Sequence, residues 1–203
     1  MKNLKLYLVS LSVVLFTFGC SDFLEPGIKT EIEIENFGKT PDETDFLLTQ
    51  AYSEMRNDAF LGSVYWAWFP SDYSIGNPGT TIQRSGIGRM EHDATDGESI
   101  LLWRACYNVI AKANLVIEKT TTGLGLAGNT ETQKAQWNRI EGEARFIRSL
   151  AYMQLATLYR NVPIITEFFK DFEKIFNISN APADKMREQE IKVYEFVVND
   201  LKK

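Results

Sequence analysis

The stretch that decides the fold runs from Thr130 to Pro163 and reads TETQKAQWNRIEGEARFIRSLAYMQLATLYRNVP. Its apolar residues recur every three or four positions and mark one face of a long helix: Trp137, Ile140, Ala144, Ile147, Ala151, Leu155 and Leu158. Thr130 and Gln133 form a capping box at its start, and Pro163 forbids its continuation. The small Ala144 and Ala151 on that face should let another helix approach closely, as in antiparallel helix pairs.

Other helices are predicted on both sides of this stretch. One begins at Thr40-Pro41-Asp42-Glu43, which combines an N-cap, a proline at the first helical position and a closing glutamate. A second runs from about Ile100 to Lys119, with Gly123 in a turn beyond its end. The last follows Pro182, and its apolar residues are expected to face inward: Ile191, Tyr194, Val197, Val198 and Leu201.

These elements define the expected fold class. We predict a mainly α protein of TPR-like stacked antiparallel helices with a long aromatic-rich loop and at most short edge strands. The alternating residues 31–35 lead toward one such strand, and Val162–Thr166 forms a short extended segment. Hydrophobic residues make up 44% of the chain and aromatic residues 12%, which is enough for the core of one ordinary domain.

The first residues have the pattern of an export signal. Lys2 and Lys5 precede an apolar run, residues 6–18, that is too short to span a bilayer as a helix. Gly19-Cys20 then suits lipoprotein processing, in which the cysteine thiol carries lipid and becomes the new N-terminus. We therefore predict a lipoprotein signal peptide at 1–19, a tether at 20–39 and a helical domain at 40–203. An ordinary secreted protein is the alternative, because Thr17-Phe18 departs from the usual lipobox.

Charge and cysteine content narrow the choice of partners. The formal net charge is −5, and loss of Lys2 and Lys5 with the signal peptide makes the mature chain still more acidic. An acidic chain repels phosphate backbones, so nucleic acid is not an expected partner. If Cys20 is acylated, Cys106 has no disulfide partner within the chain, and we expect it to be a small buried hydrophobe.

The best ligand candidates lie in the long loop between Asn57 and Ser99. Trp66 and Trp68, with Tyr73 and Asn77, offer aromatic faces on which the C–H faces of sugar rings can stack, and an amide for their hydroxyls. The alternative is that these tryptophans are core residues, as large aromatics mostly are. Trp103 and Trp137 lie on helical stripes and are expected to be core.

No catalytic, metal or cofactor site is expected. His92 is the single histidine, so a zinc site lacks ligands and a serine triad would depend on a residue in a polar loop. Glu141 and Glu143 point about 200° apart on a helix and cannot flank one glycosidic bond. Arg145 and Arg148 are expected to be surface or ion-paired side chains rather than ligand contacts.

Several blocks together resemble the SusD/RagB lipoproteins. The residues that carry the resemblance are Trp103-Arg104-Ala105-Cys106-Tyr107-Asn108-Val109-Ile110 with Ala113-Asn114, Glu143-Ala144-Arg145-Phe146-Ile147-Arg148, Val162-Pro163-Ile164-Ile165, Asn199-Asp200-Leu201 and Cys20-Ser21-Asp22. The resemblance implies a surface-exposed outer-membrane lipoprotein, acylated on Cys20, for example with palmitate. It also implies capture of glycans, or in some members peptides, and association with a TonB-dependent SusC-like transporter.

Two departures from the family pattern are visible. Arg160 stands where members usually have glycine after the long helix, so Asn161 is expected to take the turn. Members are also more than twice this length, so the domain at 40–203 is expected to be a truncated N-terminal part. Besides glycan capture, a peptide-binding member and an exported TPR-like structural or assembly lipoprotein that meets only protein partners stay open.

Overall fold

The computed structural model describes residues 36–62, 97–170, 174 and 177–203. In chain order their helical elements are α2 (Pro41–Met55), α3 (Asp58–Leu61), α6 (Gly97–Leu124), α7 (Glu131–Tyr159), the 3-10 turn η2 (Ala183–Lys185) and α9 (Met186–Leu201). These ranges contain no β-strand, and Val162–Thr166 runs without pairing to another strand. The predicted mainly α, TPR-like class is confirmed, while the possible edge strand at 31–35 lies outside the described residues.

Both predicted helix starts are confirmed by their caps. The Thr40 hydroxyl accepts a hydrogen bond from the Glu43 backbone N–H, and Pro41 opens α2. The Glu43 carboxylate accepts from the backbone N–H of Gly38 at 3.1 Å and Lys39 at 2.8 Å, residues that precede the cap. At the start of α7, Thr130 and Gln133 form the complete reciprocal box. Satisfying these N–H groups sets where each helix begins.

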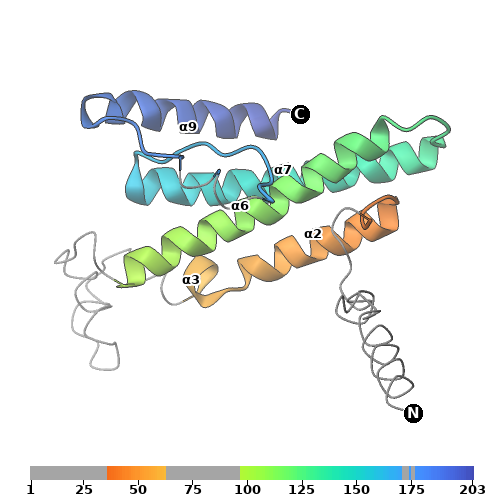
Figure 1. Cartoon of the computed structure of the whole chain (residues 1–203), viewed down its shortest axis with the longest axis horizontal. Helices are drawn as coiled ribbons and strands as arrows, with labels where there is room; N and C mark the ends of the chain where they lie inside the picture. The colour runs from red at the N-terminus through yellow and green to blue at the C-terminus, as the bar shows by residue number, and fades with distance from the viewer. Residues whose placement is uncertain (1–35, 63–96, 171–173, 175–176) are drawn as a thin grey trace, which may run out of the picture. The chain divides into compact units, whose positions relative to one another are not determined.

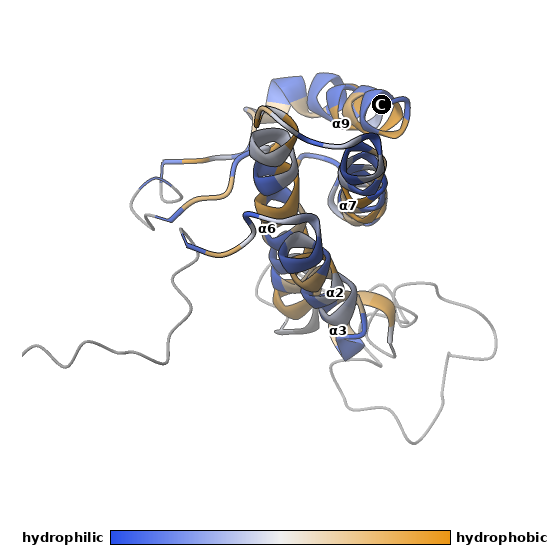
Figure 2. Ribbon diagram, turned by 90° about the vertical axis from the view of Figure 1, so that its right-hand side faces the viewer, coloured by the Kyte–Doolittle hydropathy of each residue, from blue (hydrophilic) through white to orange (hydrophobic). Residues whose placement is uncertain are grey.

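The helices stack in the order α2, α6, α7 and α9. Helices α6 and α7 form an antiparallel pair, α2 packs on α6 and α7, and α9 packs on α7 (Figure 1). The view in Figure 2 shows the same order, with α2 beside α6 and α9 beside α7. By length and composition, the segment Ser99–Leu124 of helix α6 is long and apolar enough to cross a membrane. However, 56% of its most apolar 18-residue stretch is buried inside this fold.

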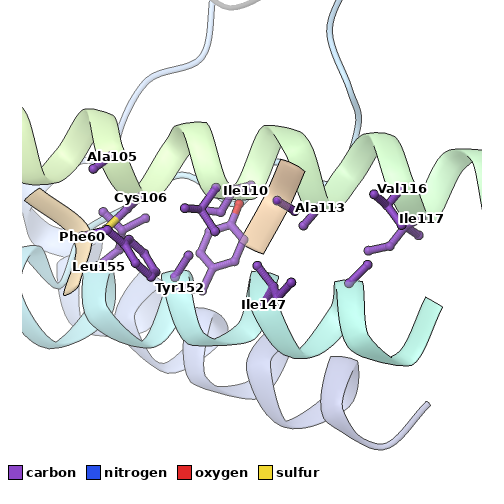
Figure 3. Close-up of a cluster of buried hydrophobic side chains, with 14 of the residues drawn as sticks. Phe60, Ala105, Cys106, Ile110, Ala113, Val116, Ile117, Ile147, Tyr152 and Leu155 are labelled. Carbon is purple, nitrogen blue, oxygen red and sulfur yellow. The ribbon is translucent and has the colours of Figure 1, made fainter. Parts of the chain in front are cut away.

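The core lies between α6 and α7 and is closed by α2 and α3. Figure 3 shows its side chains, including Ile110, Tyr152 and Leu155, together with Phe60 from α3. Ala144 and Ala151 are fully buried, as expected for positions where helices approach closely. Trp137 is buried as predicted, and so is Cys106.

Helix α6 is longer than its sequence pattern suggests. It continues to Leu124, so Gly123 lies inside the helix and not in a turn beyond it. A Cβ atom on Gly123 would come closer than 3.0 Å to three atoms of the Trp137 ring. The glycine is therefore needed for the close approach of the α6 end to α7.

The end of α7 also differs from expectation. Arg160, and not Asn161, adopts the positive φ, with φ 61° and ψ −62°. The Asn161 N–H donates to the Tyr159 carbonyl at 2.6 Å, which closes a three-residue γ-turn around Arg160. The Asn161 side chain then exchanges two hydrogen bonds with the Ala181 backbone, at 2.7 and 3.1 Å, and ties the following segment back to the helix end.

Helix α9 presents its apolar residues on two faces. Val193, Val197 and Asp200 face α7 and are buried. The predicted inward orientation is confirmed for Val197. It was wrong for the other apolar residues of the stripe, since their exposed fractions are 39–54%: Ile191, Tyr194, Val198 and Leu201. Periodicity shows that a helix has an apolar stripe, but it does not show which of two stripes is covered.

Candidate ligand-binding cleft on helix α6

The ligand-binding and lipidation candidates from the sequence lie outside the described part of the chain. Trp66, Trp68, Tyr73 and Asn77 fall in residues 63–96, and the lipidation candidate Cys20 falls in residues 1–35. His92 also falls in residues 63–96. The candidate site described below is therefore one that the sequence did not reveal.

A cleft of about 630 Å³ runs along α6, with its other wall formed by described residues between Pro163 and Asn180. Its volume falls within the range of small-molecule sites, about 300–1,000 Å³. Because its two walls come from segments that are distant in sequence, no local pattern could have shown it. The cleft combines an aromatic floor with a polar rim.

The aromatic floor is built on Trp103 and Tyr107, one turn apart on α6. Trp103 is only partly buried and packs against the core, so the expectation that it belongs to the core holds in part. Its centroid lies 5.1 Å from the Tyr107 ring and 5.0 Å from the Tyr159 ring, which meets it edge-on at 90°. Phe168 and Phe169 add apolar surface on the opposite wall.

The polar rim follows a second stripe of α6. Arg104, Asn108 and Lys112 succeed one another at four-residue intervals and so lie along one edge of the cleft. Glu54 and Glu167 also line it and balance the two cations, and Asn180 adds a further amide. Among the lining residues that the structure describes, two positive and two negative side chains thus balance.

Hydrogen bonds from buried and partly buried side chains hold the backbone of the opposite wall. The Asn114 amide donates to the carbonyls of Ile165 and Glu167, both at 3.1 Å. The Tyr107 hydroxyl donates to the Pro163 carbonyl at 2.8 Å. Tyr152 donates to the Ile165 carbonyl at 2.9 Å and accepts from its N–H at 2.6 Å. The wall is therefore fixed before any ligand arrives.

Asn114 is in turn held by a buried ionic cluster. Its side-chain oxygen accepts from the Arg148 guanidinium at 2.7 Å. Arg148 also forms two hydrogen bonds with the Asp200 carboxylate, both at 2.7 Å, and its guanidinium lies 5.2 Å from the centre of the Phe196 ring. The cluster joins α6, α7 and α9, so the helix packing and the cleft wall depend on the same side chains.

Arg145 belongs to this cluster too. It donates to Asp200 at 2.6 Å and to Glu141 at 2.8 Å. Arg145 and Arg148 are thus ion-paired, as expected. Glu141 and Glu143 are each paired with an arginine on their own helix.

Burial governs the titration of the groups around the cleft. It raises the pKa of Tyr152 to about 12 and that of Cys106 to about 12, and it also raises the pKa of Tyr107. A thiol with such a pKa is protonated near neutrality and is a poor nucleophile. The described residues contain no group of three or more His, Cys, Asp or Glu side chains placed to hold a metal ion.

Comparisons with known proteins place these features in context. A family model for SusD-like proteins, described as starch-binding associating with outer membrane, matches residues 34–203. The SusD-like protein P38 of Formosa agariphila is 24% identical over 196 residues, which are 97% of this chain and 35% of that protein. SusD-like protein P25 of the same organism is 22% identical over 169 residues, 79% of this chain and 31% of that protein.

Solved structures share the helical arrangement. A SusD homolog from Bacteroides thetaiotaomicron superposes with a TM-score of 0.62 at 22% identity, covering 86% of this chain and 32% of that structure. A SusD superfamily protein of the same organism gives 0.55 at 19% identity, covering 79% and 37%. The chain thus spans about a third of the length of the relatives it matches.

Proposed function

This chain belongs to the SusD-like family, described as starch-binding associating with outer membrane, and from that membership we propose that it serves glycan capture at the cell surface. The observation that carries the proposal is the family match over residues 34–203. In this proposal the chain is the N-terminal helical part of a lipoprotein that delivers glycans to a SusC-like TonB-dependent transporter. Its role is to bind and not to catalyse, and it requires no cofactor.

The loop tryptophans are the proposed glycan contacts. Trp66→Ala or Trp68→Ala should weaken oligosaccharide binding by about 1–2 kcal/mol for each lost stacking face, by analogy with aromatic pairs. Calorimetry against a panel of polysaccharides measures the effect, and circular dichroism verifies that the helices are intact. Unchanged affinity for a glycan that the wild type binds would place the site elsewhere. Loss of helicity in both variants would show that these side chains belong to the core.

The lipid anchor is proposed at Cys20. Cys20→Ala should release the protein from the membrane fraction, because a cleaved signal peptide leaves a single acylated residue as the attachment. Fractionation of cells with and without detergent, with the wild type run in parallel, measures the change. Retention of the variant in the membrane fraction would contradict the anchor.

The exposed stripe of α9 suggests where further chain would pack in a longer protein. Ile191, Tyr194, Val198 and Leu201 form an apolar seam with alternating spacings of three and four residues. Such a seam suits a second helix. The 203-residue chain should therefore associate more readily than a form extended at its C-terminus, as sedimentation at increasing concentration would reveal. Equal behaviour of the two forms would oppose this arrangement.

The seam also favours a second candidate function, that of an exported TPR-like assembly lipoprotein that meets only protein partners. A peptide-binding member of the same family is the nearer alternative. Binding of the purified protein to glycans separates both from the main proposal, since neither alternative expects it.

A further inference from the structure

We propose that the α6 cleft is itself a saccharide-binding surface, separate from the loop tryptophans, which takes a neutral pyranose ring of a bound glycan. This inference rests on the proposed function, because it assumes that the protein meets glycans. It assigns a role to the rim asparagines Asn108 and Asn180, which are exposed. The argument has three steps: a fixed floor, available amides and a balanced charge.

The floor is rigid before binding. Trp103 contacts both Tyr107 and Tyr159, with ring centroids 5.1 and 5.0 Å away, so its indole has little freedom to rotate. Tyr107 is held in turn by its hydrogen bond to Pro163. A ligand that stacks on these partly exposed rings loses little side-chain entropy.

The amides of the rim are available to a ligand. Asn108 and Asn180 are both exposed and line the cleft, and their side-chain amides take no part in the hydrogen bonds among the described residues. This contrasts with Asn114, whose amide is fully used in holding the wall. An amide offers both donors and an acceptor, which match the hydroxyl groups around a sugar ring.

The charge balance favours a neutral ligand. Arg104 and Lys112 line the cleft together with Glu54 and Glu167. An anionic or a cationic ligand would therefore meet a side chain of its own sign nearby, which repels it. A purely apolar ligand would cover the rim amides without bonding them, which is unfavourable. A pyranose ring has apolar C–H faces for the floor and hydroxyl groups for the rim.

Calorimetric titration of the whole chain with maltoheptaose, a neutral starch fragment, tests the inference. Asn108→Ala should raise Kd about threefold or more, since it removes hydrogen bonds to the ligand. Trp103→Ala should raise it about five- to tenfold through the lost stacking face. Asn138→Ala is the matched control, because Asn138 is an exposed helical asparagine on α7 that does not line the cleft. It should leave Kd unchanged.

The outcomes separate this inference from the proposed function. If the wild type binds and affinity falls with Trp66→Ala and Trp68→Ala but not with Asn108→Ala or Trp103→Ala, the cleft is not a saccharide site while glycan capture stands. If the wild type binds no member of a wider glycan panel, both fail. Because Trp103 also packs against the core, the exposed Asn108 decides the result should Trp103→Ala reduce helicity.

Discussion

Helix α7 carries two ionic clusters of the same chemistry in opposite surroundings. Toward its start, Arg139 pairs with Asp45 of α2 at 2.6 Å and with Glu143 at 2.7 Å, and the Arg139 side chain is 51% exposed. Toward its middle, Arg148 pairs with Asp200 of α9 at 2.7 Å, and each side chain is 4% exposed. The distances are alike, so geometry alone does not distinguish the clusters.

Burial distinguishes them. An exposed pair is screened by water and contributes about 0–1 kcal/mol, whereas removing one partner of a buried pair leaves an uncompensated charge and costs about 3–5 kcal/mol. The buried cluster consists of Asn114, Arg145, Arg148 and Asp200, which belong to the sequence blocks that resemble SusD/RagB proteins. Those blocks are therefore recognisable for architectural reasons: they join α6, α7 and α9 and hold the cleft wall.

The largest expected effect is that of Asp200→Ala. It leaves the Arg148 guanidinium buried without its carboxylate and should lower the free energy of unfolding by about 3–5 kcal/mol. Urea denaturation followed by circular dichroism measures it. Asp45→Ala removes the same group from the exposed cluster and should cost less than about 1 kcal/mol. Equal losses for the two variants would remove the basis of the comparison.

The two clusters also have tyrosines at their edges. Tyr152→Phe should lower the free energy of unfolding by about 1–3 kcal/mol, because it leaves the Ile165 N–H without its partner and removes one of the two donors to the Ile165 carbonyl. Tyr52→Phe removes an exposed hydrogen bond to Glu143 and should have a smaller effect. Chemical denaturation of both variants measures the two losses in the free energy of unfolding. A larger loss for Tyr52→Phe than for Tyr152→Phe would contradict the distinction between a buried and an exposed cluster.

Alkaline titration gives a second measure of the Tyr152 environment. Burial raises its pKa from 10.0 to about 12, so the folded state keeps the phenol protonated while the unfolded state releases the proton. Stability contributed by this group is fully present below pH 10 and is lost as the pH rises from 10.0 to about 12. Tyr152→Phe should show a shallower decline in this range. Identical pH profiles for the variant and the wild type would argue against the buried phenol.

The smallest effect concerns salt. Arg139→Ala should lower the free energy of unfolding by less than about 1 kcal/mol, and added sodium chloride should shrink the difference further because it screens exposed charges. Denaturation of the wild type and variant at low and high salt gives the comparison. A salt-independent loss of several kcal/mol would mean that this cluster behaves as a buried one.

The sequence predicted what local chemistry determines. The caps at Thr40 and Thr130 and the apolar stripe of α7 involve residues within one helix, and all are confirmed. It failed where two equivalent solutions existed, as on α9, whose two apolar stripes look alike before packing. It also placed the positive φ on Asn161, since asparagine adopts such angles more readily than the arginine that does so here.

The site was harder to predict than the fold. The cleft is formed by α6 and by residues between Pro163 and Asn180, so its aromatic floor and polar rim meet only after folding. Trp103 was assigned to the core because a helical stripe does not show that part of a ring stays exposed. The block with Ala113-Asn114 did not show what the Asn114 amide binds, since its partners are backbone carbonyls far along the chain.

Affinity electrophoresis tests the central claim, glycan binding, most directly. The whole chain would be run in native gels that contain starch or another neutral polysaccharide, and in blank gels with a non-binding reference protein. Glycan capture predicts that at least one polysaccharide retards the protein relative to the reference. Equal mobility in every gel, for a protein whose circular dichroism shows the helices formed, would contradict the account.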